Sequence, residues 1–271
     1  MGDLVMTLRL AHGLEVSTYA ESFLARCLDK RQQALNGVSS SAYLDLLGRD
    51  RAEAEGFVQS LEVHHSEFFR DPLSFALLER RLLPGLAEAK ASTGYPELRV
   101  WSAGCSAGQE AYSIAILLHE LTDQRAVPLR FRLFATDTST EQIERARAGT
   151  YPASAMSNVA LRHLQRWFSR IEDAYVVAPE LRGLVDFSIH GLLDETSDFP
   201  SASIFGEFDL VFCCNLLFYY RPESQKRMLD RLRRSLAPNG YLVTGEAERE
   251  SVQGSGFRPL ALPAAIFQAA R

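Results

Sequence analysis

Residues 98–110 read LRVWSAGCSAGQE, and this stretch decides the fold class. Its first six residues, four of them apolar, have the length of a strand, and the next five contain two glycines that allow a tight turn. A helix is predicted to begin at residue 109, and a second strand is predicted over 131–136, ending at Asp137. A strand, a helix and another strand in succession are typical of an α/β fold with parallel strands.

The same alternation of strand and helix returns later in the chain. An apolar strand over 208–214 precedes a helix that Pro222 opens. Pro238–Gly240 is predicted to be a turn into a further strand over 241–244. The repeated alternation predicts a doubly wound, Rossmann-like sheet domain.

Residues 150–190 interrupt this rhythm. A helix over 161–168 precedes two short β-like pieces at 174–177 and 184–187. We interpret the whole segment as a small β-subdomain inserted into the sheet domain.

The first 70 residues have the apolar spacing of helices. Thr18, with Glu21 three residues later, predicts a capped helix start. Further helices are expected to begin after Ser39 and after Asp50. The N-terminal part is therefore predicted to be a small helical domain.

Asp71 and Pro72 predict one more helix, which is expected to bend or end near Pro84 because an interior proline removes a backbone hydrogen bond.

We expect three parts in the chain: an N-terminal helical domain over 1–62, a linker and connecting helix over 63–97, and an α/β domain over 98–271.

The charge balance limits the classes of partner. The chain has 271 residues, with 29 Lys and Arg against 34 Asp and Glu, which gives a net charge of −5. Such a chain is not predicted to bind nucleic acid broadly, because phosphate contacts need clustered cations. The four cysteines form no C-x-x-C pair and the six histidines show no ligand spacing with them, so no metal site is predicted.

Two further expectations concern location and assembly. The N-terminus lacks a basic-then-apolar signal pattern, and no apolar run reaches the length of about 18 residues that a membrane helix needs. We expect a cytoplasmic protein without membrane insertion, and a monomer by default.

Two acidic residues are candidates for ligand binding. Glu110 opens the helix after the glycine turn, where an acid suits a ligand with a positive charge. Asp137 ends the next strand, where an acid commonly holds ribose hydroxyls. Alternatively, Gly104–Gly108 is only a tight turn, Glu110 is only favourable at a helix start, and Asp137 is a loop acid.

Other residues are open to two readings. Asn215, after the strand 208–214, either lines the ligand crevice or caps the chain reversal. Arg70 either reaches the site or is a surface residue, and the pair His64–His65 fits solvent-exposed histidines better than a metal site. A basic helix face either docks an acidic partner or is simply solvated; it consists of Arg26, Lys30 and Arg31.

Several segments, in this order, resemble the chemotaxis receptor methyltransferases (CheR-type), which transfer a methyl group from S-adenosylmethionine to receptor glutamates. They are Ser66–Asp71 (SEFFRD), Val100–Ser113 (VWSAGCSAGQEAYS), Ala135–Asp137 (ATD) and Phe208–Tyr220 (FDLVFCCNLLFYY). The resemblance covers residues 15–250. It implies a helical N-terminal domain, a linker, and a Rossmann-like domain with an inserted β-subdomain.

The resemblance also implies a site. Asp137 would hold the ribose of the cofactor, and Tyr219 would lie near the transferred methyl. Arg70 would reach the cofactor pocket, where it could orient the incoming carboxylate. The positions that match the family's cofactor site are His64, Ser66, Arg70, Gly104, Glu110, Asp137, Gly191, Leu192, Cys214 and Asn215. The partners implied are cytoplasmic helices of chemoreceptors, which are acidic at their methylation sites, and the product is S-adenosylhomocysteine.

Some positions depart from the family's pattern. The family often has asparagine where His64 and Gly191 stand, an acid where Gln109 stands, and arginine where Cys214 stands. Two other functions remain open from the sequence. One is a methyltransferase that acts on a different signalling protein or on a small carboxylic acid, and the other is a non-catalytic module that binds the cofactor.

Overall fold

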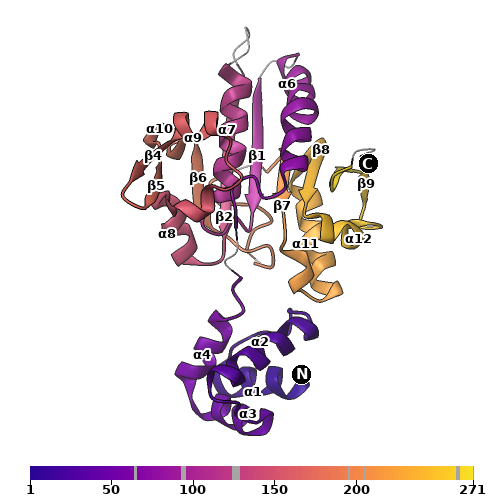
Figure 1. Ribbon diagram of the computed structural model, residues 1–271. Coiled ribbons are helices and arrows are strands. Elements are labelled where there is room, and N and C mark those ends of the chain that lie inside the picture. Colours follow the sequence, from indigo (N-terminus) through magenta and orange to yellow (C-terminus); the bar gives the residue numbers. More distant parts are fainter. Residues whose placement is uncertain are drawn as a thin grey trace. The chain divides into compact units, whose positions relative to one another are not determined.

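The computed structural model describes residues 1–63, 66–92, 96–123, 129–194, 196–203, 206–260 and 263–270. These residues form two compact units, which Figure 1 shows in sequence colours. One unit consists of Met1–Val63 together with Leu216–Arg227, and the other of His64–Asn215 together with Met228–Arg271. Each unit has an apolar core of its own.

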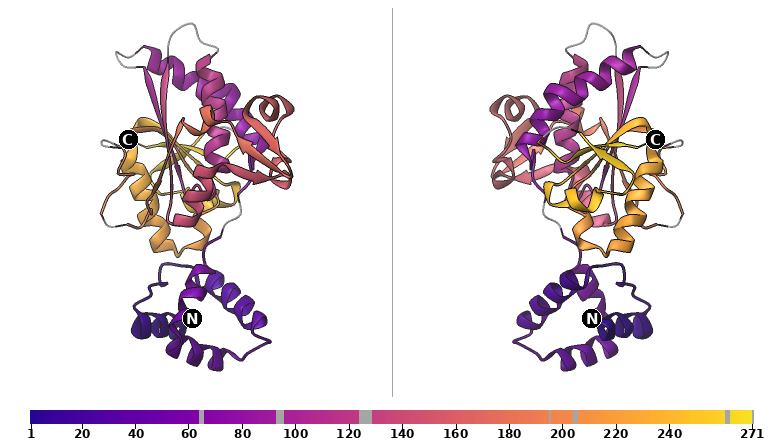
Figure 2. Two further views of the ribbon diagram at one scale, coloured as in Figure 1. Left: turned by 90° about the vertical axis from the view of Figure 1, so that its left-hand side faces the viewer. Right: turned by 90° about the vertical axis from the view of Figure 1, so that its right-hand side faces the viewer.

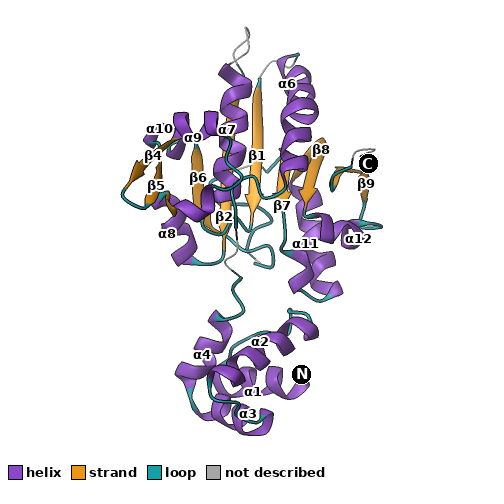
Figure 3. Ribbon diagram, viewed as in Figure 1, coloured by secondary structure: helices purple, strands orange, loops and turns teal. Residues whose placement is uncertain are grey.

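The N-terminal helices pack around the core of the first unit (Figure 3). They are α1 (Gly2–His12), α2 (Glu21–Ala34), α3 (Ser40–Arg49) and α4 (Arg51–Gln59). Ser39 caps α3 by accepting the Ala42 N–H at 3.4 Å, and Asp50 caps α4 by accepting the Ala52 N–H at 2.9 Å. The helix starts predicted after Ser39 and Asp50 are confirmed.

The predicted cap at Thr18 is wrong, because α2 begins at Glu21 with Ala20 as the residue before it. Residues 18–20 instead pair with the segment that follows strand β7 (Phe208–Cys213). The Ala20 N–H donates to the Tyr219 carbonyl at 2.8 Å, and the Thr18 carbonyl accepts the Arg221 N–H at 2.9 Å. This pairing joins residues two hundred positions apart, so a local capping pattern could not predict it.

The second unit contains a seven-stranded sheet with the order β6-β2-β1-β7-β8-β10-β9. The other strands are β1 (Glu97–Ala103), β2 (Arg130–Asp137), β6 (Val185–Ile189), β8 (Leu236–Thr244), β9 (Phe257–Pro259) and β10 (Ile266–Ala269). Neighbours from β6 to β8 pair in parallel, whereas β10 is antiparallel to both β8 and β9. The predicted doubly wound α/β class is confirmed.

Helices cover both faces of this sheet, which Figure 2 shows nearly edge-on. On one face, Val100 and Leu133 of the strands share a core with Ile114 and Leu118 of α7 (Gln109–Asp123). The helices α8 (Thr140–Ala148) and α11 (Pro222–Ser235) complete the crossovers β2–β6 and β7–β8. The crossovers β1–β2 and β2–β6 run toward one edge of the sheet, and the crossover β7–β8 runs toward the other edge. Right-handed connections therefore place α7 and α8 on one face of the sheet and α11 on the other.

The helix predicted from Asp71 and Pro72 begins as expected but does not end at Pro84. Asp71 caps α5 (Pro72–Leu77), a π-helical turn follows over Leu78–Leu82, and the helix continues as α6 (Leu83–Ala91). The widened turn shifts the hydrogen-bond register, and Pro84 then occupies the first turn of α6, where its missing N–H costs little.

The inserted subdomain is smaller than predicted. Its antiparallel sheet has the order β3-β5-β4, with β3 (Thr150–Pro152), β4 (Phe168–Ile171) and β5 (Ala174–Val177), and its helices are α9 (Leu161–Trp167) and α10 (Pro179–Arg182). The piece expected at 184–187 is not part of it. That piece is β6, which pairs in parallel with β2 from Leu133↔Val185 to Asp137↔Ile189 and buries Val185 and Phe187 in the main core.

The last strands also differ from expectation. Pro238–Gly240, predicted as a turn, lies inside β8, whose pairing with β7 shifts register between Phe208 and Leu210. A Cβ at Gly240 would lie 2.8 Å from the Phe208 carbonyl oxygen, so this irregular strand requires glycine there. After β8 come a 3₁₀ turn over Glu246–Glu248 and α12 (Arg249–Val252).

Candidate active site

The carboxyl ends of β1, β2, β7 and β8 lie at one edge of the sheet. The chain runs from β1 outward to β2 and β6, then returns to place β7 on the other side of β1. Ligands of doubly wound sheets bind at such a switch point, in the crevice outside the strand ends. The loops after these strands therefore define the candidate site (Figure 1).

The glycine turn after β1 is held by backbone contacts. The Gly104 and Cys105 N–H groups both donate to the Thr136 carbonyl, at 2.8 and 2.9 Å. Gly108 has φ +91°, and a Cβ there would lie 2.9 Å from the Cβ of Ala146 in α8. Glycine at this position therefore allows both the turn and the close approach of the helices.

Asp137 joins the loops after β1 and β2. Its Oδ2 accepts the Ser106 N–H at 2.8 Å, and its Oδ1 accepts the Ser139 N–H at 3.0 Å. The side chain is half-buried. Each carboxylate oxygen can accept more than one hydrogen bond, so both retain capacity for a further donor such as a hydroxyl.

Glu110 begins α7 beside the end of β1. Its Oε1 accepts the hydroxyl of Ser102 at 2.7 Å, and the Cys214 thiol is a second hydrogen-bond partner. Burial raises the pKa of Glu110, and the negative charge of Glu248 raises it further, against the opposing effects of Ser102, Cys214 and Arg70. A cation bound beside this carboxylate would favour its ionised form.

Asn215 follows β7 and Cys214 in a left-handed conformation, with φ +59°. Its N–H donates to Oε2 of Glu248 at 2.7 Å, and the same oxygen accepts the Gly245 N–H at 2.8 Å. Glu248 is fully buried and was not predicted as a site residue. The signal available in the sequence was an acid close behind a predicted strand, the same pattern that marked Asp137.

Gly191 and Leu192 follow β6 in a turn that is held from two sides. The Gly191 N–H donates to Asp194 at 2.9 Å, and its carbonyl accepts from Arg231 at 3.3 Å. A Cβ at Gly191 would lie 3.0 Å from the methyl group of Thr138. Close packing beside Asp137 therefore explains why glycine stands at this position.

The linker segment of the SEFFRD motif is anchored by its phenylalanines. Phe68 and Phe69 are buried, and the Phe69 N–H donates to the Ser113 hydroxyl in α7 at 3.0 Å. Ser66 is half-buried, and Arg70 is exposed but close enough for its charge to lower the pKa of Glu110. The prediction for His64 lies outside the described residues.

The remaining predicted residues belong to the first unit. Tyr219 packs its ring 4.8 Å from that of Phe23. Arg26 and Lys30 are exposed on α2. Arg31 is engaged by Glu53, with 2.6 Å between Nη2 and Oε2, so its charge is already compensated within the helical core.

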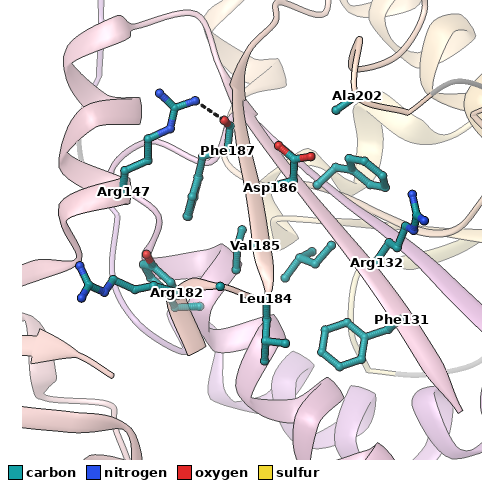
Figure 4. A pocket seen from close by; sticks show the side chains of 13 residues that line it. Phe131, Arg132, Arg147, Arg182, Leu184, Val185, Asp186, Phe187 and Ala202 are labelled. Carbon is teal, nitrogen blue, oxygen red and sulfur yellow. Dashed lines mark hydrogen bonds between the residues drawn. The ribbon is translucent and has the colours of Figure 1, made fainter. Parts of the chain in front are cut away.

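A separate pocket of about 630 Å³ lies beside β6 (Figure 4). Tyr112, Phe187 and Asp186 are among its lining residues, and Arg147 of α8 donates to the Phe187 carbonyl there. None of the residues predicted to hold the cofactor lines this pocket.

A family model described as "CheR methyltransferase, SAM binding domain" matches residues 64–265. The chain belongs to the CheR methyltransferase family. The resemblance seen in the sequence is confirmed, and residues 64–265 match the S-adenosylmethionine-binding domain of this family.

Curated relatives of the chain include two proteins named as methyltransferases and one uncharacterized protein. An "Uncharacterized 104.1 kDa protein in hypE 3'region" of Rhodobacter capsulatus is 33% identical over 100% of this chain but only 28% of that protein. The "Chemotaxis protein methyltransferase" of Salmonella typhimurium is 32% identical over 88% of this chain and 80% of that protein. The "Probable biofilm formation methyltransferase WspC" of Pseudomonas aeruginosa is 30% identical over 93% of this chain and 57% of that protein. The chain thus spans little more than a quarter of the first relative.

The loops of this CheR-family chain fit S-adenosylmethionine by the chemistry of their donor set. Asp137 offers two carboxylate oxygens with spare acceptor capacity, which suits the two neighbouring hydroxyls of a ribose. Glu110 offers a half-buried carboxylate, which suits a cationic group. The residues present therefore match both the sugar and the positive charge of the cofactor.

Two further findings bear on the sequence predictions. Within the part of the chain that the structure describes, no three or more His, Cys, Asp and Glu side chains gather into a possible metal site. A search of the same residues for a helix long and apolar enough to cross a bilayer found none.

Proposed function

We propose that this chain transfers a methyl group from S-adenosylmethionine to glutamate side chains of a chemotaxis receptor, giving glutamate methyl esters and S-adenosylhomocysteine. The observation that carries the proposal is the pair of carboxylates, Glu110 and Asp137, at the switch point of a CheR-family sheet. Relatives named "Chemotaxis protein methyltransferase" support the choice of a chemotaxis protein as the acceptor.

The cofactor site in this proposal consists of the loops described above. Asp137 binds the ribose hydroxyls, and Glu110 lies beside the cationic part of the cofactor. The other proposed contacts are His64, Ser66, Arg70, Gly104, Gly191, Leu192, Cys214 and Asn215.

When bound, S-adenosylmethionine supplies a methyl group on a positively charged sulfur. The receptor glutamate attacks as a carboxylate, which is already ionised at neutral pH because the reference pKa of glutamate is about 4.3. One O–C bond forms, one S–C bond breaks, and no proton moves, so no general base is required. The protein contributes by holding the carboxylate in line, about 3 Å from the methyl, and by excluding water.

Arg70 and Tyr219 take the catalytic roles in this proposal. Arg70 orients the incoming carboxylate through a charge-assisted hydrogen bond, and Tyr219 donates its hydroxyl near the reacting groups. We expect Arg70→Ala to lower kcat by about 10- to 100-fold and also to weaken cofactor binding, because Arg70 is one of the proposed cofactor contacts. Tyr219→Phe should also lower kcat. The control is Tyr220→Phe, because the ring of Tyr220 stacks on that of Tyr19 and Tyr220 has no proposed catalytic role. Full turnover in Arg70→Ala or in Tyr219→Phe would remove the role of that residue.

The receptor is proposed to dock on the first unit. Arg26 and Lys30 are exposed cations on α2, and the methylated helices of such receptors are acidic, so the charges are complementary. Arg31 is proposed to share this role, although its charge is also paired with Glu53.

The acceptor is tested with a labelled methyl donor. Purified protein is incubated with radioactive S-adenosylmethionine and receptor cytoplasmic fragments, and base-labile label on glutamate is measured. We expect label on the fragments and none when the methylated glutamates are replaced by alanine. Label on another signalling protein, at a rate far above that on the receptor, would contradict the proposal.

A second acceptor class has one observation in its favour. The relative named as a biofilm formation methyltransferase matches 93% of this chain, slightly more than the chemotaxis methyltransferase of Salmonella typhimurium matches. A signalling receptor outside chemotaxis would be methylated by the same displacement. The labelling assay separates the two classes when both kinds of receptor fragment are offered in competition.

A further inference from the structure

Tyr151, in strand β3 of the inserted subdomain, reaches the glycine turn of the candidate cofactor site. Its hydroxyl donates to the Ala107 carbonyl at 2.5 Å. Both residues are buried, with 3% of Tyr151 and 4% of Ala107 exposed. Burial raises the pKa of the Tyr151 hydroxyl, so the group stays protonated and remains a donor. A side chain from outside the main sheet therefore holds the turn that follows β1.

The glycine turn has a backbone conformation that needs such support. Three of its five residues have positive φ, with +78° at Gly104, +49° at Ser106 and +91° at Gly108. Ser106 carries a side chain, so the left-handed conformation costs free energy at this position. Contacts to other parts of the chain have to compensate for this cost.

The same turn orients the carboxylate of Asp137. The Ser106 N–H donates to Oδ2 of Asp137 at 2.8 Å. The Ser106 N–H and the Ala107 carbonyl belong to one short turn, so a change in its φ and ψ angles moves both groups. A donor that fixes the Ala107 carbonyl therefore also limits the directions in which Ser106 can hold Asp137.

The ring of Tyr151 contacts a second part of the candidate site. Phe68 of the SEFFRD motif packs against it edge-on, with 4.9 Å between the ring centroids and 85° between the ring planes. Ser66 and Arg70 lie in the same motif. The tyrosine thus contacts the linker through its ring and the glycine turn through its hydroxyl, and a phenylalanine at this position would remove only the second contact.

We propose that Tyr151 is a positioning residue of the cofactor site: its hydroxyl holds the glycine turn in the conformation in which Ser106 orients Asp137. Without the hydroxyl, the turn populates other conformations, and the ligand has to select the productive one at a cost in affinity. The inference rests on the proposed binding of the ribose by Asp137, and it is independent of the methyl acceptor.

A second buried tyrosine provides a matched control for Tyr151→Phe. The hydroxyl of Tyr112 donates to the Ala146 carbonyl at 2.7 Å, between α7 and α8 and outside the glycine turn. Tyr112→Phe and Tyr151→Phe each keep the ring and remove one buried hydrogen bond to a backbone carbonyl. Urea unfolding should therefore show a similar loss of stability in both variants.

Calorimetry with S-adenosylhomocysteine measures the effect on the site without methyl transfer. We expect the Kd to rise by about three- to tenfold in Tyr151→Phe and to stay within about 1.5-fold of the wild-type value in Tyr112→Phe. Amide hydrogen exchange of the ligand-free protein is the second measurement. The Ser106 N–H should exchange at least about threefold faster in Tyr151→Phe, and at the wild-type rate in Tyr112→Phe.

The inference is overturned if Tyr151→Phe binds the ligand as the wild type does, or if both tyrosine variants raise the Kd equally. A higher Kd without faster exchange of the Ser106 N–H would also overturn it, because the turn would not be the cause. Asp137→Asn is titrated beside them. If it binds normally, the ribose placement is wrong and the inference fails with it. If it binds weakly while Tyr151→Phe binds normally, only the role of Tyr151 is wrong. No receptor is present, so neither result bears on receptor methylation.

Discussion

The two sides of the candidate site hold their carboxylates in different ways. On the β2 side, Asp137 is half-buried, and each of its carboxylate oxygens accepts one backbone N–H, from Ser106 or Ser139. Both oxygens can still accept a hydrogen bond from a hydroxyl. On the other side, Glu110 is also half-buried but lies beside the fully buried Glu248, whose charge, together with burial, raises the pKa of Glu110. The difference indicates that one side is suited to the sugar of the cofactor and the other to its positive charge.

The largest effect is expected from Asp137→Asn. An amide has one acceptor atom, so its NH₂ group must face the N–H of either Ser106 or Ser139, and a hydroxyl contact is lost as well. Hydrogen bonds to a charged group contribute about 1.5–3 kcal/mol each, so we expect S-adenosylmethionine affinity to fall by about 100-fold. Calorimetry measures this, with Asp186→Asn in β6 as the control. A change below about threefold would contradict the ribose role.

Glycine-to-alanine substitutions test whether the turns on the two sides of the site are equally constrained, by their effect on the free energy of unfolding. Gly108→Ala on the β1–β2 side places a Cβ 2.9 Å from Ala146 at φ +91°, so both the backbone and a rigid neighbour resist. Gly245→Ala on the other side meets mainly the end of the Asn215 side chain, which can rotate away. We expect Gly108→Ala to lower the free energy of unfolding by about 2–4 kcal/mol and Gly245→Ala by less than about 1 kcal/mol.

Urea unfolding measures both values. Gly85→Ala is the matched control, because a Cβ at Gly85, in α6, meets nothing within 4 Å. Helix propensity predicts that this control is stabilised by up to about 1 kcal/mol. Equal destabilisation of Gly108→Ala and Gly245→Ala would show that the two turns are not constrained differently.

The pH dependence of binding depends on Glu110. Burial raises its pKa above the ordinary value of 4.5, and a cationic ligand prefers the ionised carboxylate. S-adenosylmethionine affinity should therefore increase as pH rises through the pKa of Glu110, with proton release on binding. We expect Glu110→Gln to bind about tenfold more weakly at neutral pH, and its affinity should no longer depend on pH in this window.

The stability of the ligand-free protein should follow the opposite trend. The pKa of Glu110 is higher in the folded chain than in the unfolded chain. The folded chain therefore binds the extra proton between these values, and its free energy of unfolding falls as pH rises through the window. Glu110→Gln should flatten that slope in urea unfolding at several pH values. An unchanged slope would remove Glu110 as its cause.

The smallest effect is expected from charge reversal on α2. Lys30→Glu should raise the KM for an acidic receptor fragment by about threefold at low salt, and added salt should reduce the difference. Cofactor affinity should not change. Arg51→Glu, an exposed arginine on α4, serves as the control. An equal rise in KM for both variants would show that the effect depends on the net charge of the protein, and not on a docking face on α2.

Local patterns predicted much of the fold. The strands β1, β2 and β7, the glycine turn at 104–108 and the capped starts after Ser39 and Asp50 are encoded within a few consecutive residues. The features that were missed depend on distant partners. The piece at 184–187 belongs to the main sheet because it pairs with β2. Thr18 does not cap a helix, because its carbonyl accepts the N–H of Arg221.

The residues of the candidate site also differ in how far local sequence predicts them. Glu110 could be selected because it follows a recognisable strand and a glycine turn, and Asp137 because it ends a recognisable strand. Glu248 also lies close behind a predicted strand, but its role depends on accepting the N–H of Asn215, thirty-three residues earlier, and on its complete burial. Neither property is visible in the letters of one segment.

A crystal structure of the protein soaked with S-adenosylhomocysteine tests the central claim most directly. We predict the ribose hydroxyls within hydrogen-bond distance of both oxygens of Asp137, and the sulfur on the side of the site that Glu110 and Glu248 form. A nucleoside bound instead in the pocket beside β6, with Asp137 and Glu110 touching only the protein, would contradict it.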